Sequence, residues 1–166
     1  NSFPDQLFKL KTKAYRVSQK FVLRTSDYAE IKKYCDKLKI EFLCTPFDIK
    51  SVDQLEELHV RRYKVSSPDL VDMPLHNKIL LTQKPVILST GMANISEIKK
   101  TVNYYKKNGM SEITLLHCVS NYPCSIKSLN LKSMVKLKKI FNLPVGFSDH
   151  SVGSDAAIIS VGLGAT

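Results

Sequence analysis

Val86-Ile87-Leu88-Ser89-Thr90-Gly91 is an apolar run that ends in a small polar cluster, and this order recurs along the chain of 166 residues. The other stretches of this kind are Phe42-Leu43-Cys44-Thr45-Pro46-Phe47-Asp48, Tyr63-Lys64-Val65-Ser66-Ser67, Leu115-Leu116-His117-Cys118 and Val145-Gly146-Phe147-Ser148-Asp149-His150. Each stretch is followed by a segment with helical spacing of apolar residues. Because the carboxyl ends of parallel strands meet on one face of a β/α barrel, we expect these clusters to form one pocket.

The segments around these stretches predict about six strands separated by helices. The strands are expected at residues 7–12, 41–46, 62–66, 85–90, 113–119 and 144–148. Most are continuous apolar runs, which are typical of parallel strands covered on both faces. The expected helix starts are an N-cap at Ser26, a capping-box pair of Ser51 and Gln54, Asp72 with Pro74, and Asn94 with Glu97.

Two further helices complete the predicted pattern. One runs from Ser128 to Phe141 with an apolar face of Leu131, Met134, Val135 and Ile140, and the last, tightly packed, follows Gly153. In the first predicted helix, residues Ile31, Tyr34, Cys35 and Leu38 recur at helical spacing. A closed barrel needs eight βα units and about 250 residues. About six units therefore fit either an open doubly wound sheet or part of a larger barrel.

Composition restricts the class of protein. Hydrophobic residues make up 43% and charged residues 24% of the chain, as in ordinary globular proteins. No apolar run reaches the roughly 20 residues that span a bilayer, and no secretory leader is recognisable. We therefore expect a cytoplasmic protein without a membrane partner. The four cysteines match no paired zinc motif, which favours buried free thiols.

The net charge of +10 raises the alternative of a non-catalytic basic domain that binds nucleic acid. The lysines are spread over several predicted helices and are not interleaved with exposed aromatic residues. Nucleic-acid binding requires a concentrated basic stripe, so we expect no nucleic-acid partner. A positive field would also draw an anionic substrate towards a cleft.

Five motifs in one order carry a resemblance to a known family. They are Thr45-Pro46-Phe47-Asp48, Tyr63-Lys64-Val65-Ser66-Ser67, Lys84-Pro85-Val86-Ile87-Leu88-Ser89-Thr90-Gly91-Met92, Leu115-Leu116-His117-Cys118-Val119-Ser120-Asn121-Tyr122-Pro123 and Pro144-Val145-Gly146-Phe147-Ser148-Asp149-His150. From about residue 41 to 166 the chain resembles the sialic acid synthase family. Each motif alone is weak, whereas their shared order and spacing are specific.

The resemblance implies an enzyme that condenses phosphoenolpyruvate with an amino sugar such as N-acetylmannosamine. It also implies a divalent metal, Mn²⁺ first and Mg²⁺ or Co²⁺ as substitutes, and a homodimer of the full-length protein. The family's catalytic domain is an eight-stranded TIM barrel followed by a small antifreeze-like domain. We accordingly expect residues 1–166 to be a partial TIM-barrel catalytic domain, in which the first strand, the last strand and the antifreeze-like domain are absent.

Phosphoenolpyruvate is a trianion, so its site needs cations and hydroxyl groups that converge from several strands. A lysine in an apolar strand is costly unless an anion pairs with it, which makes Lys64 the first candidate. The resemblance implies that the substrate-binding residues are Lys64, Thr45, Ser67, Ser89, Lys9, Ser120 and Ser148. Lys9 departs from the family's usual context. Pro68 replaces a family glycine and removes a backbone donor.

The resemblance also implies roles for acid–base and metal-binding groups. Asp69 and Tyr122 are the expected catalytic residues, and His150 is the expected metal ligand. His117 is left open between the pocket and a hydrogen-bonded core position, while His59 and His76 are expected on the surface. The nearest alternative is another phosphoenolpyruvate-using or aldolase-type barrel enzyme, in which Lys64 would form a Schiff base.

Overall fold

Four parallel strands form the centre of the molecule. The computed structural model describes residues 21–166, and its strands are β1 (Tyr63–Val65), β2 (Val86–Ser89), β3 (Ile113–Cys118) and β4 (Val145–Ser148). They form one sheet in the order β1-β2-β3-β4, and every neighbouring pair is parallel. Strand order therefore follows chain order, as successive βα units require.

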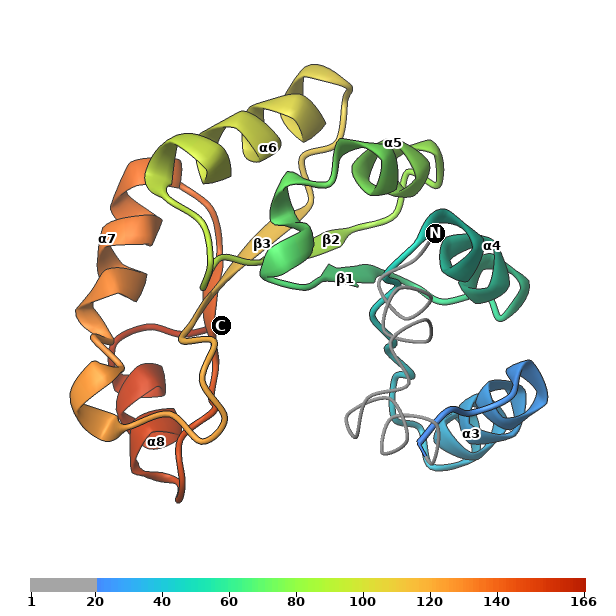
Figure 1. Ribbon diagram of the computed structural model, residues 1–166, viewed down its shortest axis with the longest axis horizontal. Coiled ribbons are helices and arrows are strands. Elements are labelled where there is room, and N and C mark those ends of the chain that lie inside the picture. The colour runs from blue at the N-terminus through green and yellow to red at the C-terminus, as the bar shows by residue number, and fades with distance from the viewer. Residues whose placement is uncertain (1–20) are drawn as a thin grey trace, which may run out of the picture.

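Helices alternate with these strands and, in Figure 1, α5, α6 and α7 follow one another along one side of the sheet. The helical segments are α3 (Thr25–Lys37), α4 (Ile49–Glu57), the 3-10 helix η1 (Pro68–Val71), α5 (Met73–Leu81), α6 (Ile95–Lys107), the 3-10 helix η2 (Ile126–Ser128), α7 (Lys132–Phe141) and α8 (Asp155–Gly162). No helix in this described part is long and apolar enough to cross a membrane.

One row of the sheet packs against the helices. Val65, Leu88, Leu115 and Val145 are paired in register across all four strands, and all are buried. Successive side chains of a strand point to opposite faces. The neighbours of this row, such as Lys64 and Ser89, therefore lie on the opposite face, away from the helices.

Four predicted strands are confirmed, with ends that differ from the prediction by one residue at most. The prediction of a strand at residues 41–46 is wrong, because this segment forms neither helix nor strand. Phe42 and Cys44 pack partly against the core, whereas Leu43 is 40% exposed. Only one side of this segment is therefore covered, unlike the strands in the sheet. The strand predicted at 7–12 lies outside the described residues.

Two predicted helix starts are confirmed. The Asp72 carboxylate accepts the Leu75 N–H at 3.1 Å, and Asn94 forms a capping box with Glu97. The start predicted at Ser51 is wrong, because α4 begins at Ile49. Asp48 is its cap and accepts the Ser51 N–H at 2.7 Å.

The predictions for the last two helices need correction. Helix α7 begins at Lys132 instead of Ser128, and its buried residues are Met134, Leu137 and Phe141. Ile140 lies outside this face and is 44% exposed. Helix α8 buries Ala156 and Ser160 but exposes Ile158, Ile159 and Val161, so it is not tightly packed.

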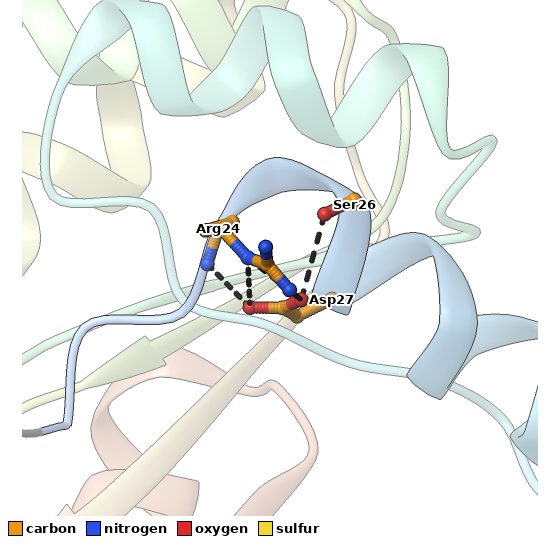
Figure 2. Close-up of polar contacts among 3 residues, drawn as sticks. All are labelled: Arg24, Ser26 and Asp27. Carbon is orange, nitrogen blue, oxygen red and sulfur yellow. Dashed lines mark hydrogen bonds and ion pairs between the residues drawn. The ribbon is translucent and has the colours of Figure 1, made fainter.

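Helix α3 begins one residue before the predicted cap. Its N-cap is Arg24, whose backbone N–H donates to the Asp27 carboxylate at 2.8 Å. Figure 2 shows that the Arg24 guanidinium and the Ser26 hydroxyl also donate to this carboxylate. Helix α3 has no buried residue. Its predicted apolar face is therefore not a core-packing face in this structure.

Candidate active site at the carboxyl ends of the strands

A cavity of about 320 Å³ lies where the four strands end. Its lining residues are Phe47, Lys64, Ser66, Ser67, Pro68, Ser89, Met92, Cys118, Ser120, Tyr122, Ser148 and His150. Every strand contributes to it, directly or through the loop that follows. The predicted convergence of the polar clusters is thus seen for the clusters of all four strands.

Lys64 brings a positive charge into this cavity. Its neighbours Tyr63 and Val65 are buried on the helix side of β1, so alternation directs Lys64 to the other face. Within residues 21–166, no carboxylate forms an ion pair with the Lys64 ammonium group. A half-buried cation without a counter-ion favours the binding of an anion.

Two serines beside Lys64 present hydroxyl groups. The Ser89 Oγ is buried and is the one buried side-chain N or O atom of the described residues that has no hydrogen-bond partner. The Ser67 Oγ accepts the Gly91 N–H at 3.1 Å and lies 3.1 Å from the Cys118 Sγ. An unpaired buried hydroxyl costs about 1–3 kcal/mol. A polar ligand in the cavity would remove this cost at Ser89.

Gly91 allows the loop after β2 to approach β3 closely. A Cβ atom at this position would lie 2.7 Å from the Cys118 Sγ and 2.8 Å from the Cys118 carbonyl oxygen. Such distances are shorter than any normal contact, so a side chain at Gly91 would displace the cavity wall. Gly91 and Cys118 belong to the predicted strand-end clusters, but sequence reasoning gave neither residue a role of its own in the site.

His150 is held in one tautomer by its backbone contact. Its Nδ1 lies 2.6 Å from the Val119 carbonyl oxygen, which can only accept, so Nδ1 carries the proton. The Nε2 lone pair then faces the Tyr122 hydroxyl at 3.0 Å and the Ser148 Oγ at 3.3 Å. A neutral imidazole with its far nitrogen fixed by a carbonyl is the usual form of a metal-binding histidine.

His150 could supply one ligand to a divalent metal. In the described part of the chain no group of three or more His, Cys, Asp or Glu residues is arranged to hold a metal ion. The Tyr122 ring stacks on the His150 ring with centroids 4.0 Å apart. Because Tyr122 is 78% exposed, its hydroxyl is free to leave Nε2 when a ligand binds there.

Three predicted site residues are not placed in this cavity. The Asp69 carboxylate accepts a hydrogen bond from the Ser66 hydroxyl and does not line the cavity. Thr45 lines a separate cavity of about 320 Å³ between α3 and α4, which shares only Phe47 with the site. Lys9 lies outside the described residues.

The remaining histidines occupy different environments. His117 is buried, and its Nε2 donates to the Leu129 carbonyl at 2.7 Å, so the core alternative is correct. His59 is exposed, as predicted. The prediction for His76 is wrong, because its side chain is fully buried. A larger cavity, of about 570 Å³, adjoins His59, Lys39 and Arg61 and contains no strand-end residue.

Known proteins are similar in sequence to this chain over most of its length. It is 41% identical over 165 residues to N,N'-diacetyllegionaminic acid synthase of Campylobacter jejuni, covering 95% of this chain and 49% of that protein. It is 38% identical over 156 residues to pseudaminic acid synthase of Helicobacter pylori, covering 94% and 46% respectively. The chain thus spans about half the length of these curated relatives.

Solved structures agree on the fold. The structure of N-acetylneuraminic acid (sialic acid) synthetase from Leptospira borgpetersenii, in complex with citrate, superposes with a TM-score of 0.91 at 32% identity, covering 98% of this chain and 56% of that chain. Solved barrel synthases share the arrangement, so the sheet is part of a parallel β/α barrel and not an open doubly wound sheet. The sequence pattern of the NeuB family matches residues 3–166, and the chain belongs to that family.

Proposed function

We propose that the protein containing this chain condenses phosphoenolpyruvate with the open-chain form of an amino sugar and releases phosphate. Family membership supports the reaction class, since the relatives at 41% and 38% identity are named as synthases of legionaminic and pseudaminic acid. The observation that carries the proposal is the composition of the strand-end cavity. Among residues 21–166, it combines a Lys64 ammonium group without an ion-pair partner, a Ser89 hydroxyl without a hydrogen-bond partner and the His150 Nε2 lone pair.

The cavity residues would bind phosphoenolpyruvate through its anionic oxygens. The Lys64 ammonium group provides the positive charge, and hydroxyl groups of Ser67 and Ser89 donate from the neighbouring strand ends. Charge-assisted hydrogen bonds of this kind are about twice as strong as neutral ones. Ser120 and Ser148, on the far side of the cavity, are placed to contact the sugar or the carboxylate.

The reaction then requires one new carbon–carbon bond. The C3 carbon of phosphoenolpyruvate attacks the aldehyde carbon of the sugar, and water adds to C2. The C2–O bond of the tetrahedral adduct breaks, and phosphate leaves. The residues around Lys64 would hold the phosphate group throughout and orient C3 towards the sugar, which lowers the entropic part of the barrier.

His150 is the residue of this chain that would hold a divalent metal, for which Mn²⁺ is the first candidate. When bound, such an ion polarises the aldehyde oxygen as a Lewis acid. The Val119 carbonyl accepts the Nδ1–H, which leaves Nε2 as the nitrogen that would bind the ion and fixes the direction of the ring. The Tyr122 hydroxyl, which lies on the same nitrogen, would be released to contact the sugar.

The test is phosphate release from phosphoenolpyruvate by the full-length protein. It should require a sugar and Mn²⁺ and should stop on addition of a chelator. N-acetylmannosamine and the diacetamido hexoses that lead to legionaminic and pseudaminic acids are compared in parallel. Release with one of them identifies the sugar. An absence of release with every sugar would contradict the proposal.

Borohydride separates the proposed reaction from aldolase-type chemistry at Lys64. A Schiff-base lysine would be trapped by borohydride in the presence of a keto acid, with a mass increase on Lys64. The proposed condensation uses Lys64 only as a cation, so no adduct should form. An adduct would show that the cavity performs the alternative chemistry.

A further inference from the structure

The segment Ser66–Val71 connects β1 to α5 and forms one wall of the candidate site. Ser66, Ser67 and Pro68 line the cavity, and the Ser66 hydroxyl donates to the Asp69 carboxylate. On the cavity side, the Gly91 N–H donates a hydrogen bond to the Ser67 Oγ and so holds the segment. Its position therefore decides where the Ser67 hydroxyl lies.

The outer side of this segment is held at Leu70. The Leu70 side chain is fully buried, and its carbonyl oxygen accepts two hydrogen bonds from other helices. The donors are the His76 Nε2 of α5 and the Thr101 Oγ1 of α6, each at 2.9 Å. A carbonyl oxygen has two lone pairs, so both are used.

His76 is itself oriented from α6. Its Nδ1 lies 2.8 Å from the Tyr105 hydroxyl, and the two rings meet edge to face with centroids 5.3 Å apart. Because the Leu70 carbonyl can only accept, Nε2 carries the proton and Nδ1 accepts from Tyr105. The neutral imidazole thus satisfies one acceptor and one donor in a site that excludes water.

We propose that His76 is a positioning residue, which fixes the wall Ser66–Val71 through the Leu70 carbonyl and so sets the place of the Ser67 hydroxyl in the cavity. His76 does not contact the cavity, so it would act on substrate only through this segment. The effect on substrate binding rests on the function proposed above. The effect on the segment itself does not.

The experiment compares His76→Leu and His76→Gln in the full-length protein. Leucine removes both hydrogen bonds, whereas the glutamine amide keeps a donor for Leu70 and an acceptor for Tyr105. The loss of one buried hydrogen bond changes an equilibrium constant by about tenfold. We expect His76→Leu to raise the KM for phosphoenolpyruvate by about that factor, with a smaller change in kcat and recovery in His76→Gln.

Hydrogen exchange provides a readout that does not depend on activity. The amides of Asp69, Leu70 and Asp72 donate to carbonyl oxygens of the segment, so their exchange should rise in His76→Leu by about tenfold. The amides of β3 should keep their wild-type rates. If His76→Leu does not fold, Thr101→Val removes the second donor to the same carbonyl and should show the same local pattern.

Ser160→Ala is the matched control. The buried Ser160 hydroxyl also donates to a helix carbonyl, that of Ala157 at 2.7 Å, but in α8. This variant should leave the KM and the exchange of residues 66–72 unchanged. Equal acceleration of exchange across all strands in His76→Leu, with an unchanged KM, would overturn the positioning role. If the wild-type protein releases no phosphate, the proposed reaction fails, and local exchange still decides the role of His76.

Discussion

Residues 63–148 and residues 21–48 obtain their order in different ways. In the first region, the four strands are paired in register, and a row of buried side chains runs across them to the helices. In the second region, α3 buries no residue, and segment 41–46 forms no strand. The candidate site, apart from Phe47 and His150, is built from the first region.

The contrast shows that contacts within one helix contribute less to a fixed position in the fold than burial between two layers does. Helix α3 has contacts within itself, such as the Asp27 cap and the ion pair of Lys32 with Asp36 at 2.7 Å. Such exposed pairs contribute little to stability. Burial between two layers gives β1–β4 their fixed positions, and a site that must place a lysine, serines and a histidine together depends on that burial.

The largest difference between the two regions should appear on truncation of an apolar side chain. Leu115 is fully buried in β3, so Leu115→Ala should lower the free energy of unfolding by about 2–5 kcal/mol. Ile31→Ala, on the exposed helix α3, should change it by less than about 0.5 kcal/mol. Urea unfolding of the full-length variants measures both. Equal losses would show that α3 is as firmly packed as the sheet.

A second large effect should follow from filling the space at Gly91. The added methyl group would meet Cys118 at 2.7 Å, and overpacking of this kind costs about 1–3 kcal/mol. Gly91→Ala should therefore reduce kcat/KM for phosphoenolpyruvate by about 10- to 100-fold. Gly162→Ala is the matched control, because no atom lies within 4 Å of its new methyl group. A Gly91→Ala enzyme with unchanged kinetics would place the substrate elsewhere.

A moderate effect should appear in the pH dependence of stability. Burial lowers the pKa of His76 below its usual 6.5, while the nearby Asp69 and Asp72 act in the opposite direction, and Tyr105 faces its Nδ1. The unfolded chain therefore binds this proton at a higher pH than the folded protein. Stability contributed by neutral His76 is complete above about pH 6.5 and falls as the pH is lowered below it.

The measurement for this prediction is the melting temperature between pH 7.5 and pH 5. The wild-type protein should lose more stability over this interval than His76→Gln, whose amide does not titrate. Parallel curves for the two proteins would mean that His76 takes up its proton as readily in the folded protein as in the unfolded chain.

The smallest effect is expected at the start of α3. Hydrogen bonds from Arg24 hold the pKa of the Asp27 carboxyl below its ordinary value. Asp27→Ala removes this cap, so amide exchange in the first turn of α3 should rise, because the turn frays. The global melting temperature should not change, since α3 buries nothing. A clear drop in the melting temperature would show that α3 supports the sheet.

The sequence allowed the strand ends to be predicted because each carries its own signal. Apolar runs that end in small polar clusters located β1–β4, and Asp72 and Asn94 marked helix starts correctly. Burial that depends on contacts between distant segments could not be predicted in the same way. His76 stands next to the polar residues Asn77 and Lys78 in α5, which gives no signal of burial, and the packing of α6 against η1 encloses it.

Placement in the cavity was also only partly predictable. Lys64 and Ser89 lie in paired strands of the sheet and His150 follows one, so they converge as expected. Thr45 lies in segment 41–46, which forms no strand, and it lines another cavity. The position of a side chain at a strand end is therefore predictable only when the strand itself is paired.

The most direct test of the active-site assignment is phosphate release by His150→Ala compared with His59→Asn, in the full-length protein and over a range of Mn²⁺ concentrations. His59 is an exposed histidine with a φ of 53°, which asparagine tolerates, so its replacement tests loss of a histidine outside the strand-end cavity. We expect His150→Ala to lose activity at every Mn²⁺ concentration at which wild type is active, whereas His59→Asn should match wild type. Full activity of His150→Ala with an unchanged Mn²⁺ requirement would contradict the assignment of this cavity as the active site.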